Sequence, residues 1–254
     1  KTNKGNILRG GLNSFAQYGE NSRLRDIYNA DELKNMNPNE LVEIIKDLNN
    51  FKHRVFYYGK DVNAAKTALN TYHEVPSELK DYPVAKEYTQ KETGKDVYFA
   101  DFDMVQAELF FIAKGDQFDA KKMALSTVFN SYFGRGFSSV VVQEIRESKG
   151  LAYSASAGYS NASDAKKSDI VYAYIGTQAN KVPEAVDAML ILMNDMPESE
   201  EQFNTAKESA LKQIAAQRIT KSNIFWNYEG LQKRGLDYDN REEMYKQIQD
   251  MTLE

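Results

Sequence analysis

Cysteine is absent from the 254 residues of the sequence. This excludes disulfide bridges, thiolate metal sites and cysteine nucleophiles, but it leaves the compartment open. Histidine is scarce as well, since only His53 and His73 occur, twenty positions apart. A catalytic zinc site takes about three protein ligands, and two histidines four positions apart on a helix are its usual sign. We therefore expect no metal in this chain, with His53 at the start of a strand and His73 at a helix end.

Long apolar runs and basic clusters are also missing. No segment approaches the ~18 apolar residues of a membrane-spanning helix, and no signal peptide opens the chain. We expect a soluble protein without membrane insertion, in either the bacterial cytoplasm or the periplasm. The net charge is −5, and because phosphate binding needs a concentrated basic face, nucleic acid is excluded as a partner. The chain begins with Lys1 rather than methionine, which suggests a piece of a longer protein.

The overall composition, with 42% hydrophobic and 27% charged residues, is typical of a globular protein. Asn37 and Pro38 start a helix whose apolar residues share one face. Residues 53–58 (HRVFYY) favour a strand, and Asp61 caps a second helix. Residues 1–80 are expected to complete one α/β domain. A polar connector follows at 81–95.

A second domain is expected over residues 96–254. Strands are predicted near 97–102, 105–113, 153–159 and 171–175, where apolar and other residues alternate. Helices are predicted from about 119, from 138 or 139 to 148, and through most of 182–254. About five strands in total, grouped between runs of helix, predict an α+β fold. We expect a two-layer α/β sandwich with a mostly antiparallel sheet, truncated at both ends.

The stretch from Phe133 to Tyr159 (FGRGFSSVVVQEIRESKGLAYSASAGY) is the most informative. Gly134 and Gly136 allow unusual backbone conformations in a loop, and Gly150 is suited to the end of a helix. Arg146 and Tyr153 lie seven positions apart across the predicted helix–turn–strand junction. Such a junction can bring a guanidinium and a phenol to the same edge of a sheet.

This stretch resembles the C-terminal-half signature of the pitrilysin/insulinase peptidases. That signature is a glycine-containing loop followed by Arg-Glu-x-x-Gly-Leu-x-Tyr, which here runs from Arg146 to Tyr153. Tyr98 to Lys114 resembles the opening strand pair of the family. Leu41 to Lys60 is similar to the helix and strand that close the preceding homologous domain. The chain is therefore identified as a segment of the non-catalytic half of such a peptidase.

The resemblance implies a division of labour between two related halves that enclose a chamber. One half holds zinc through a His-x-x-Glu-His helix and a distant glutamate. The other half would use Arg146 to bind carbonyl or carboxylate oxygens of the substrate. Tyr153 would hydrogen-bond the scissile carbonyl as it becomes an oxyanion. The zinc is then expected in the parent's other half or in a partner subunit, and this chain alone is expected to be inactive.

The loop Gly134–Arg135–Gly136 is a further candidate for substrate contact, alongside its plainer role as a connector. Tyr172 and Tyr174 either line the chamber wall or simply cover the sheet. The expected substrate is a peptide or unfolded protein. Two rival readings remain: a zinc-free structural or substrate-holding subunit of the same family, and an unrelated α+β ligand-binding domain. The family reading requires Arg146 and Tyr153 to face one surface.

Overall fold

The computed structural model describes residues 3–254, which form two compact units. One unit comprises the chain up to Leu24 together with Thr89–Glu254, and the other is Arg25–Tyr88. The expected division placed residues 1–80 in one domain and 96–254 in the next. The two divisions differ in where the N-terminal helix belongs, so the assignment to homologous domains stays a prediction.

An antiparallel sheet of three strands lies at the centre of the larger unit. Its strands are β1 (Gln106–Gln117), β2 (Ser154–Ser160) and β3 (Ser168–Gln178), in the order β1-β3-β2. Side chains alternate between the two faces of a strand. Ala173 and Ile175 of β3 are fully buried on one face, while Tyr172 and Tyr174 are half-buried on the other. The alternation predicted for β3 is confirmed.

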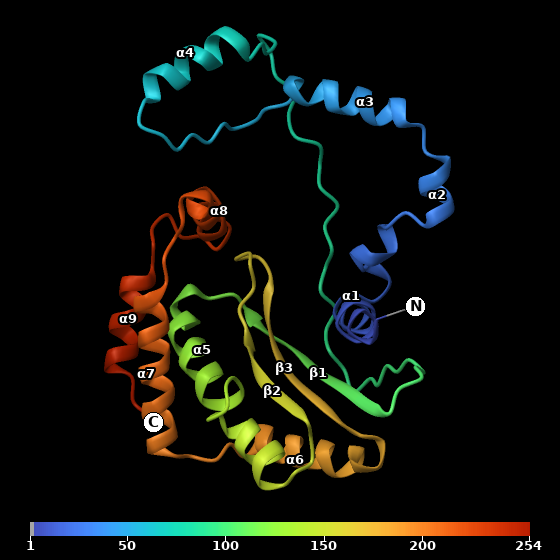
Figure 1. Cartoon of the computed structure of the whole chain (residues 1–254), viewed down its shortest axis with the longest axis vertical. Coiled ribbons are helices and arrows are strands. Elements are labelled where there is room, and N and C mark those ends of the chain that lie inside the picture. Colours follow the sequence, from blue (N-terminus) through green and yellow to red (C-terminus); the bar gives the residue numbers. More distant parts are fainter. Residues whose placement is uncertain (1–2) are drawn as a thin grey trace. The chain divides into compact units, whose positions relative to one another are not determined.

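Helices follow β1 along the chain, and several of them pack on the buried face of the sheet. They are α5 (Met123–Phe129), which continues as a π-helix over Asn130–Gly134, a π-helix over Val142–Ser148, α6 (Val182–Asn194), α7 (Glu200–Ala216), α8 (Ile224–Lys233) and α9 (Arg241–Asp250). Figure 1 shows α5 and α7 on one side of the sheet and the N-terminal helix on the other. The fold is α+β, as predicted from the grouping of strands and helices.

The apolar spacing of α6 explains why it packs onto the sheet. Ala185, Ala188, Met189 and Leu192 recur at helical spacing, and all four are buried in the same core cluster. Tyr132 joins this layer to the next helix, because its hydroxyl donates to the Pro197 carbonyl (2.6 Å). The same hydroxyl accepts from the Ser199 amide (2.9 Å) just before α7. A single buried phenol thus fixes the start of α7 against the core.

The N-terminal helix consists of a π-helical part (Asn6–Leu12) and α1 (Asn13–Tyr18). The smaller unit contains α2 (Ala30–Asn35), α3 (Pro38–Asp47) and α4 (Val62–Tyr72). Asn37 and Asp61 cap α3 and α4 through their side chains, as predicted. No residue between Arg25 and Tyr88 is buried. Within the described part of the chain, no helix combines the length and the apolar character needed to cross a membrane.

Two predicted strands are wrong. Residues 53–58 and 97–102 have no strand assignment, and the smaller unit contains only an isolated bridge between Phe51 and Lys80. Both segments have the β-branched and aromatic composition of strands, but a strand also requires a hydrogen-bonded neighbour. The described residues therefore contain three strands rather than the expected five.

Gly134 lies where a helix approaches the backbone of β2 closely. A Cβ atom at this position would lie 2.0 Å from the Ala157 carbonyl oxygen and 2.5 Å from the Ala157 nitrogen. Both contacts are with backbone atoms of β2, which cannot move away as a flexible side chain could. Glycine is therefore required for the end of this helix to pack on the strand.

We expect Gly134→Ala to lower the free energy of unfolding by roughly 2–3 kcal/mol, because the added methyl group overpacks the interface. The measurement is urea unfolding followed by circular dichroism. Gly230→Ala in α8 is the matched control, because nothing lies within 4 Å of its Cβ position. It should leave the protein unchanged or stabilise it by up to about 1 kcal/mol. Equal effects at the two glycines would contradict the packing role of Gly134.

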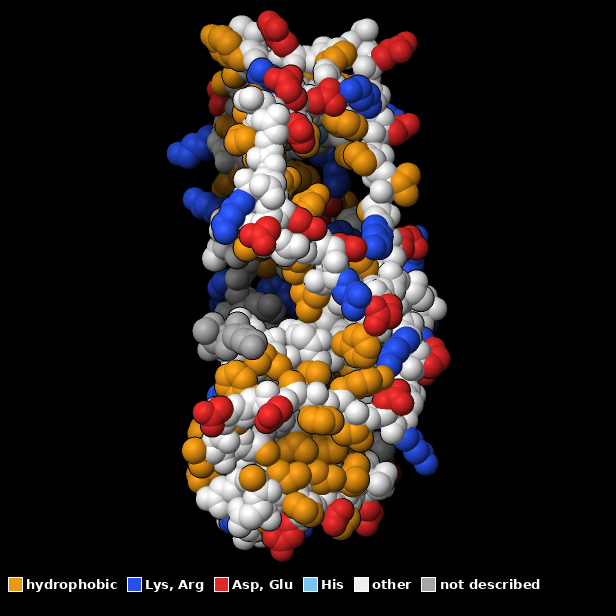
Figure 2. Space-filling model, turned by 90° about the vertical axis from the view of Figure 1, so that its right-hand side faces the viewer, with side chains coloured by type: hydrophobic (Ala, Val, Ile, Leu, Met, Phe, Trp, Pro, Cys, Tyr) orange, Lys and Arg blue, Asp and Glu red, His pale blue; other side chains and the backbone are white. Residues whose placement is uncertain are grey.

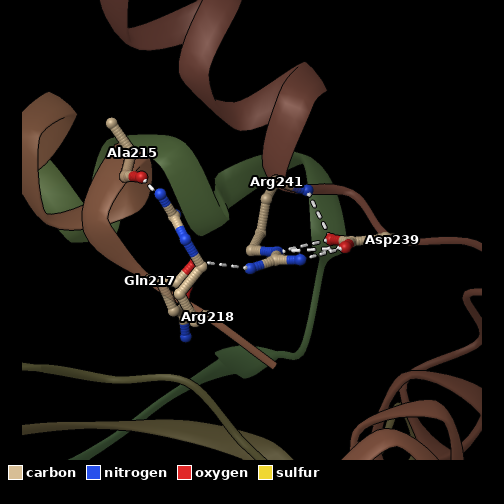
Figure 3. A network of polar contacts seen from close by, with 5 residues as sticks. All are labelled: Ala215, Gln217, Arg218, Asp239 and Arg241. Carbon is tan, nitrogen blue, oxygen red and sulfur yellow. Dashed lines mark hydrogen bonds and ion pairs between the residues drawn. The ribbon is translucent and has the colours of Figure 1, made fainter. Parts of the chain in front are cut away.

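A polar network joins the end of α7 to the start of α9 (Figure 3). The Arg241 guanidinium donates from Nε to both carboxylate oxygens of Asp239 (2.8 and 3.0 Å). It also donates from Nη1 to the Gln217 carbonyl (3.3 Å). Hydrogen bonding from Arg241 lowers the pKa of Asp239 below its ordinary value of 3.8. The folded state therefore favours the ionised carboxylate.

This shift predicts a pH dependence with a defined sign. A lowered folded pKa stabilises the protein above the unfolded pKa, and the stabilisation is lost as pH falls through the folded value. Asp239 is partly exposed, so we expect Asp239→Asn to cost only about 0.5–1 kcal/mol at neutral pH. Unfolding curves at several pH values should show this difference at neutral pH and its progressive loss as the pH falls below the ordinary carboxyl pKa of 3.8. Asp187→Asn, at an exposed position of α6, should show no such loss.

Candidate functional site

Tyr153 lies immediately before β2, at the end of the sheet. Its amide donates to the Gly176 carbonyl of β3 (2.9 Å). Its side chain is 56% exposed, and its hydroxyl accepts from Gln178 Nε2 (3.0 Å). Gln178 occupies the same face of β3 as Tyr172 and Tyr174, because side chains two apart share a face. The hydroxyl proton of Tyr153 is left available for donation to a further acceptor.

Arg146 lies on the π-helical turn Val142–Ser148, which Gly150 ends with a positive φ of 57°. Its Nε lies 3.4 Å from Glu147 Oε1, and its guanidinium lies 5.6 Å from the ring centroid of Phe137. Both partners of the ion pair are exposed. In the part of the chain that the structure describes, no hydrogen bond joins Arg146 to Tyr153. The joint role of these two residues stays a prediction.

The loop after Gly134 carries the third candidate. Gly136 has a φ of 92°, a left-handed conformation that favours glycine. Arg135 between the two glycines is exposed, and its Nε and Nη2 both donate to the Tyr172 hydroxyl (3.3 and 3.2 Å). The structure thus brings Arg135 onto the face of the sheet opposite the core. We call this the outer face.

The outer face follows from the strand register. Tyr174 lies between Phe110 of β1 and Ser156 of β2, and Tyr172 lies between Ile112 and Gly158. The Phe110 and Tyr172 rings are stacked, with centroids 5.7 Å apart and planes 7° apart. A Cβ at Gly158 would lie 3.1 Å from the Tyr172 hydroxyl, so glycine leaves room for the phenol. The outer face is aromatic at β3 and small and polar along β2.

The N-terminal helix adds two basic residues to the outer face. Lys4 forms an ion pair with Glu108 of β1 (2.7 Å), and this hydrogen bond raises the pKa of Lys4. The Arg9 guanidinium lies 4.9 Å from the ring centroid of Tyr174, which is a cation–π geometry. Arg9 did not emerge from the sequence, because no local pattern links the N-terminal helix to β3.

The two histidines lie in the smaller unit. Their Nε2 atoms are 2.7 Å apart, and His53 Nδ1 contacts the Phe51 carbonyl at the same distance. Among residues 3–254, no group of three His, Cys, Asp or Glu side chains is placed to hold a metal ion. A catalytic zinc site takes about three such ligands, and the described residues bring no set of that kind together.

A cavity of about 1130 Å³ runs beside β1. It is lined by apolar residues of β1, the N-terminal helix and α6, including Leu109, Phe111 and Leu190. Phe99 in the neighbouring segment is 85% exposed. Figure 2 shows apolar side chains gathered near the lower end of the side of the molecule drawn there, over the region of β1 and α6.

Comparison with protein families finds one match. A family model described as the inactive domain of peptidase M16 matches residues 35–210. This region includes the Arg146–Tyr153 run and the three strands. No curated protein sequence matches the chain.

Solved structures share the fold at low sequence identity. A conserved protein from Enterococcus faecalis is 16% identical with a TM-score of 0.68, covering 95% of this chain and 58% of its own. A peptidase M16 inactive domain from Pseudomonas fluorescens is 18% identical with a TM-score of 0.55, covering 75% of this chain and 45% of its own. The ferredoxin protease FusC, solved as a mutant with Arabidopsis ferredoxin, is 12% identical with a TM-score of 0.65. The match covers 96% of this chain and 27% of the FusC chain. The chain therefore spans about half, or less, of the length of these structures.

Proposed function

This chain belongs to the peptidase M16 (pitrilysin) family through its inactive domain, and from that premise we propose that it is the substrate-contacting part of a zinc-dependent endopeptidase. Zinc would be held by the other half of the parent or by a partner subunit. Tyr153 carries the proposal, because its hydroxyl is exposed, oriented by Gln178, and has its proton available. A positioned donor of this kind stabilises an oxyanion more than the carbonyl from which the oxyanion forms.

The other predicted site residues take supporting roles in this proposal. Arg146 is exposed on the turn before Tyr153, where its guanidinium could bind a substrate carbonyl or carboxylate oxygen. Gly136 gives the preceding loop its left-handed turn, and Arg135 extends from that loop to the outer face. Gly134 contributes by holding the loop against β2. The substrate class is an extended peptide or an unfolded protein.

We expect Tyr153→Phe in the full-length parent to lower kcat by about 100-fold or more while KM changes little, because the lost donor acts mainly in the transition state. Arg146→Gln should both lower kcat and raise KM. Both are measured with a quenched fluorescent peptide. Tyr228→Phe, at an exposed tyrosine of α8, is the control and should behave as wild type. An unchanged kcat for Tyr153→Phe would remove the oxyanion role.

We also propose that the smaller unit completes a separate α/β domain whose remainder lies in the parent's catalytic half. The apolar stripe of α3 supports this, since Leu41, Ile44, Ile45 and Leu48 are each 58–61% exposed. An amphipathic helix ordinarily buries such a stripe against a sheet or another helix. The strand-like segment 53–58 has the composition to join the same sheet.

Ile44→Ser tests this arrangement. It should lower the free energy of unfolding of the full-length parent by about 2–3 kcal/mol, because the side chain is then buried. In the 254-residue chain the same change should have almost no effect. Lys46→Ser, on the polar side of α3, should be nearly neutral in both. An Ile44→Ser effect of equal size in the two proteins would contradict the proposal.

A further inference from the structure

We infer that the outer face of the sheet contains a carboxylate-binding subsite formed by Arg135, Tyr172 and Arg9, so that an acidic group on the bound peptide is recognised there. The inference rests on the proposed function for the idea that a peptide reaches this face. Its chemistry is separate from that of Arg146 and Tyr153. The ligand class is a carboxylate of a peptide, either an Asp or Glu side chain or the C-terminal group.

The first support is the hydrogen-bond geometry at Arg135. Its Nε and Nη2 donate to the same oxygen, the Tyr172 hydroxyl. A guanidinium has five N–H groups, so the remaining N–H groups of Arg135 can still donate. The Tyr172 hydroxyl accepts from Arg135 and therefore directs its own proton elsewhere. Two kinds of donor are thus placed side by side, and a carboxylate accepts from both.

The second support is the rigidity of this pair. Tyr172 lies on the central strand, its ring stacks on Phe110, and Gly158 in the neighbouring strand leaves room for its hydroxyl. Arg135 extends from a short loop that is held by the packing of Gly134 on β2. A donor pair that is already ordered loses little conformational entropy when a ligand binds.

The third support is the charge of the outer face. Among the described residues, neither Arg135 nor Arg9 has a carboxylate within ion-pair distance. Glu108, the acidic side chain of this face, is already paired with Lys4. Tyr172 and Tyr174 are two positions apart on the same face of β3, and the Arg9 guanidinium lies 4.9 Å from the Tyr174 ring centroid. An excess of positive charge thus persists on one face of a chain whose net charge is −5.

The test measures peptide binding rather than turnover, so its outcome does not depend on the oxyanion role of Tyr153. Three tetramethylrhodamine-labelled peptides of alternating serine and valine are titrated with the 254-residue chain and followed by fluorescence anisotropy. The first has a central glutamate and a C-terminal amide. The second has glutamine in place of the glutamate. The third is the glutamine peptide with a free C-terminal carboxylate.

We expect at least one carboxylate peptide to bind about tenfold more tightly than the neutral peptide in low salt, with the difference shrinking at high salt. Preference for the first peptide identifies an acidic side chain as the ligand, and preference for the third identifies the C-terminal group. Arg135→Gln should remove most of the preference, and Arg9→Gln part of it. Tyr172→Phe, which retains the ring stacked on Phe110, should also weaken it.

Arg218→Gln is the matched control. Arg218 donates to the Ala215 and Gln217 carbonyls at the end of α7, so its loss removes the same charge from another part of the unit. The inference fails if Arg218→Gln and Arg135→Gln reduce the preference equally, because the effect would then be net charge alone. It also fails if the three peptides bind equally well or if none binds. A merely structural Arg135 would change the stability of the chain and leave the peptide preference unaltered.

Discussion

The close approach of a helix backbone to β2 is the constraint on which the rest of the larger unit depends. Gly134 touches the backbone of Ala157, and the buried positions of the central strand nearby are occupied by residues as small as Ala173. A helix can lie so near a sheet only where neither surface carries a large side chain. On the central strand, Tyr172 and Tyr174 alternate with the buried Ala173 and so lie on the opposite face. There Arg135 donates to the Tyr172 hydroxyl, and the Arg9 guanidinium lies over the Tyr174 ring.

The same packing explains how a loop and a strand end can act as precise donors. β3 is hydrogen-bonded on both sides, so Gln178 and Tyr172 occupy defined positions. Gln178 orients the Tyr153 hydroxyl, and Tyr172 orients the Arg135 guanidinium. In both cases an exposed group is held by a neighbour on the rigid central strand. In the proposed function, donors held in this way would stabilise developing charge, because preorganised donors need not reorient as charge forms.

Sequence patterns predicted the elements whose partners lie close in the chain or whose periodicity is strong. The alternation in β3, the apolar spacing of α6 and the left-handed turn at Gly150 all follow from local chemistry. The strand predictions for residues 53–58 and 97–102 are wrong because composition indicates a preference for the strand conformation but does not show whether a neighbouring strand is present. Arg9 was missed for a related reason, since its contact with Tyr174 spans most of the chain. For the candidate site, Tyr153, Arg146, Arg135 and Tyr172 could be named in advance, but Gln178 and the contact between Arg135 and Tyr172 required the structure.

The exposed stripe of α3 and the proposed zinc-binding half of the parent lead to one conclusion about the proposed assembly. A segment of 64 residues with no buried side chain cannot offset the conformational entropy that its ordering costs. The proposed assembly would stabilise it by covering the apolar stripe of α3. In the proposed assembly the covering surface belongs to the half that supplies the metal, so folding of Arg25–Tyr88 and completion of the active site are thermodynamically linked. Conditions that separate the halves would then disorder the smaller unit as they abolish activity, whereas the larger unit retains its own core.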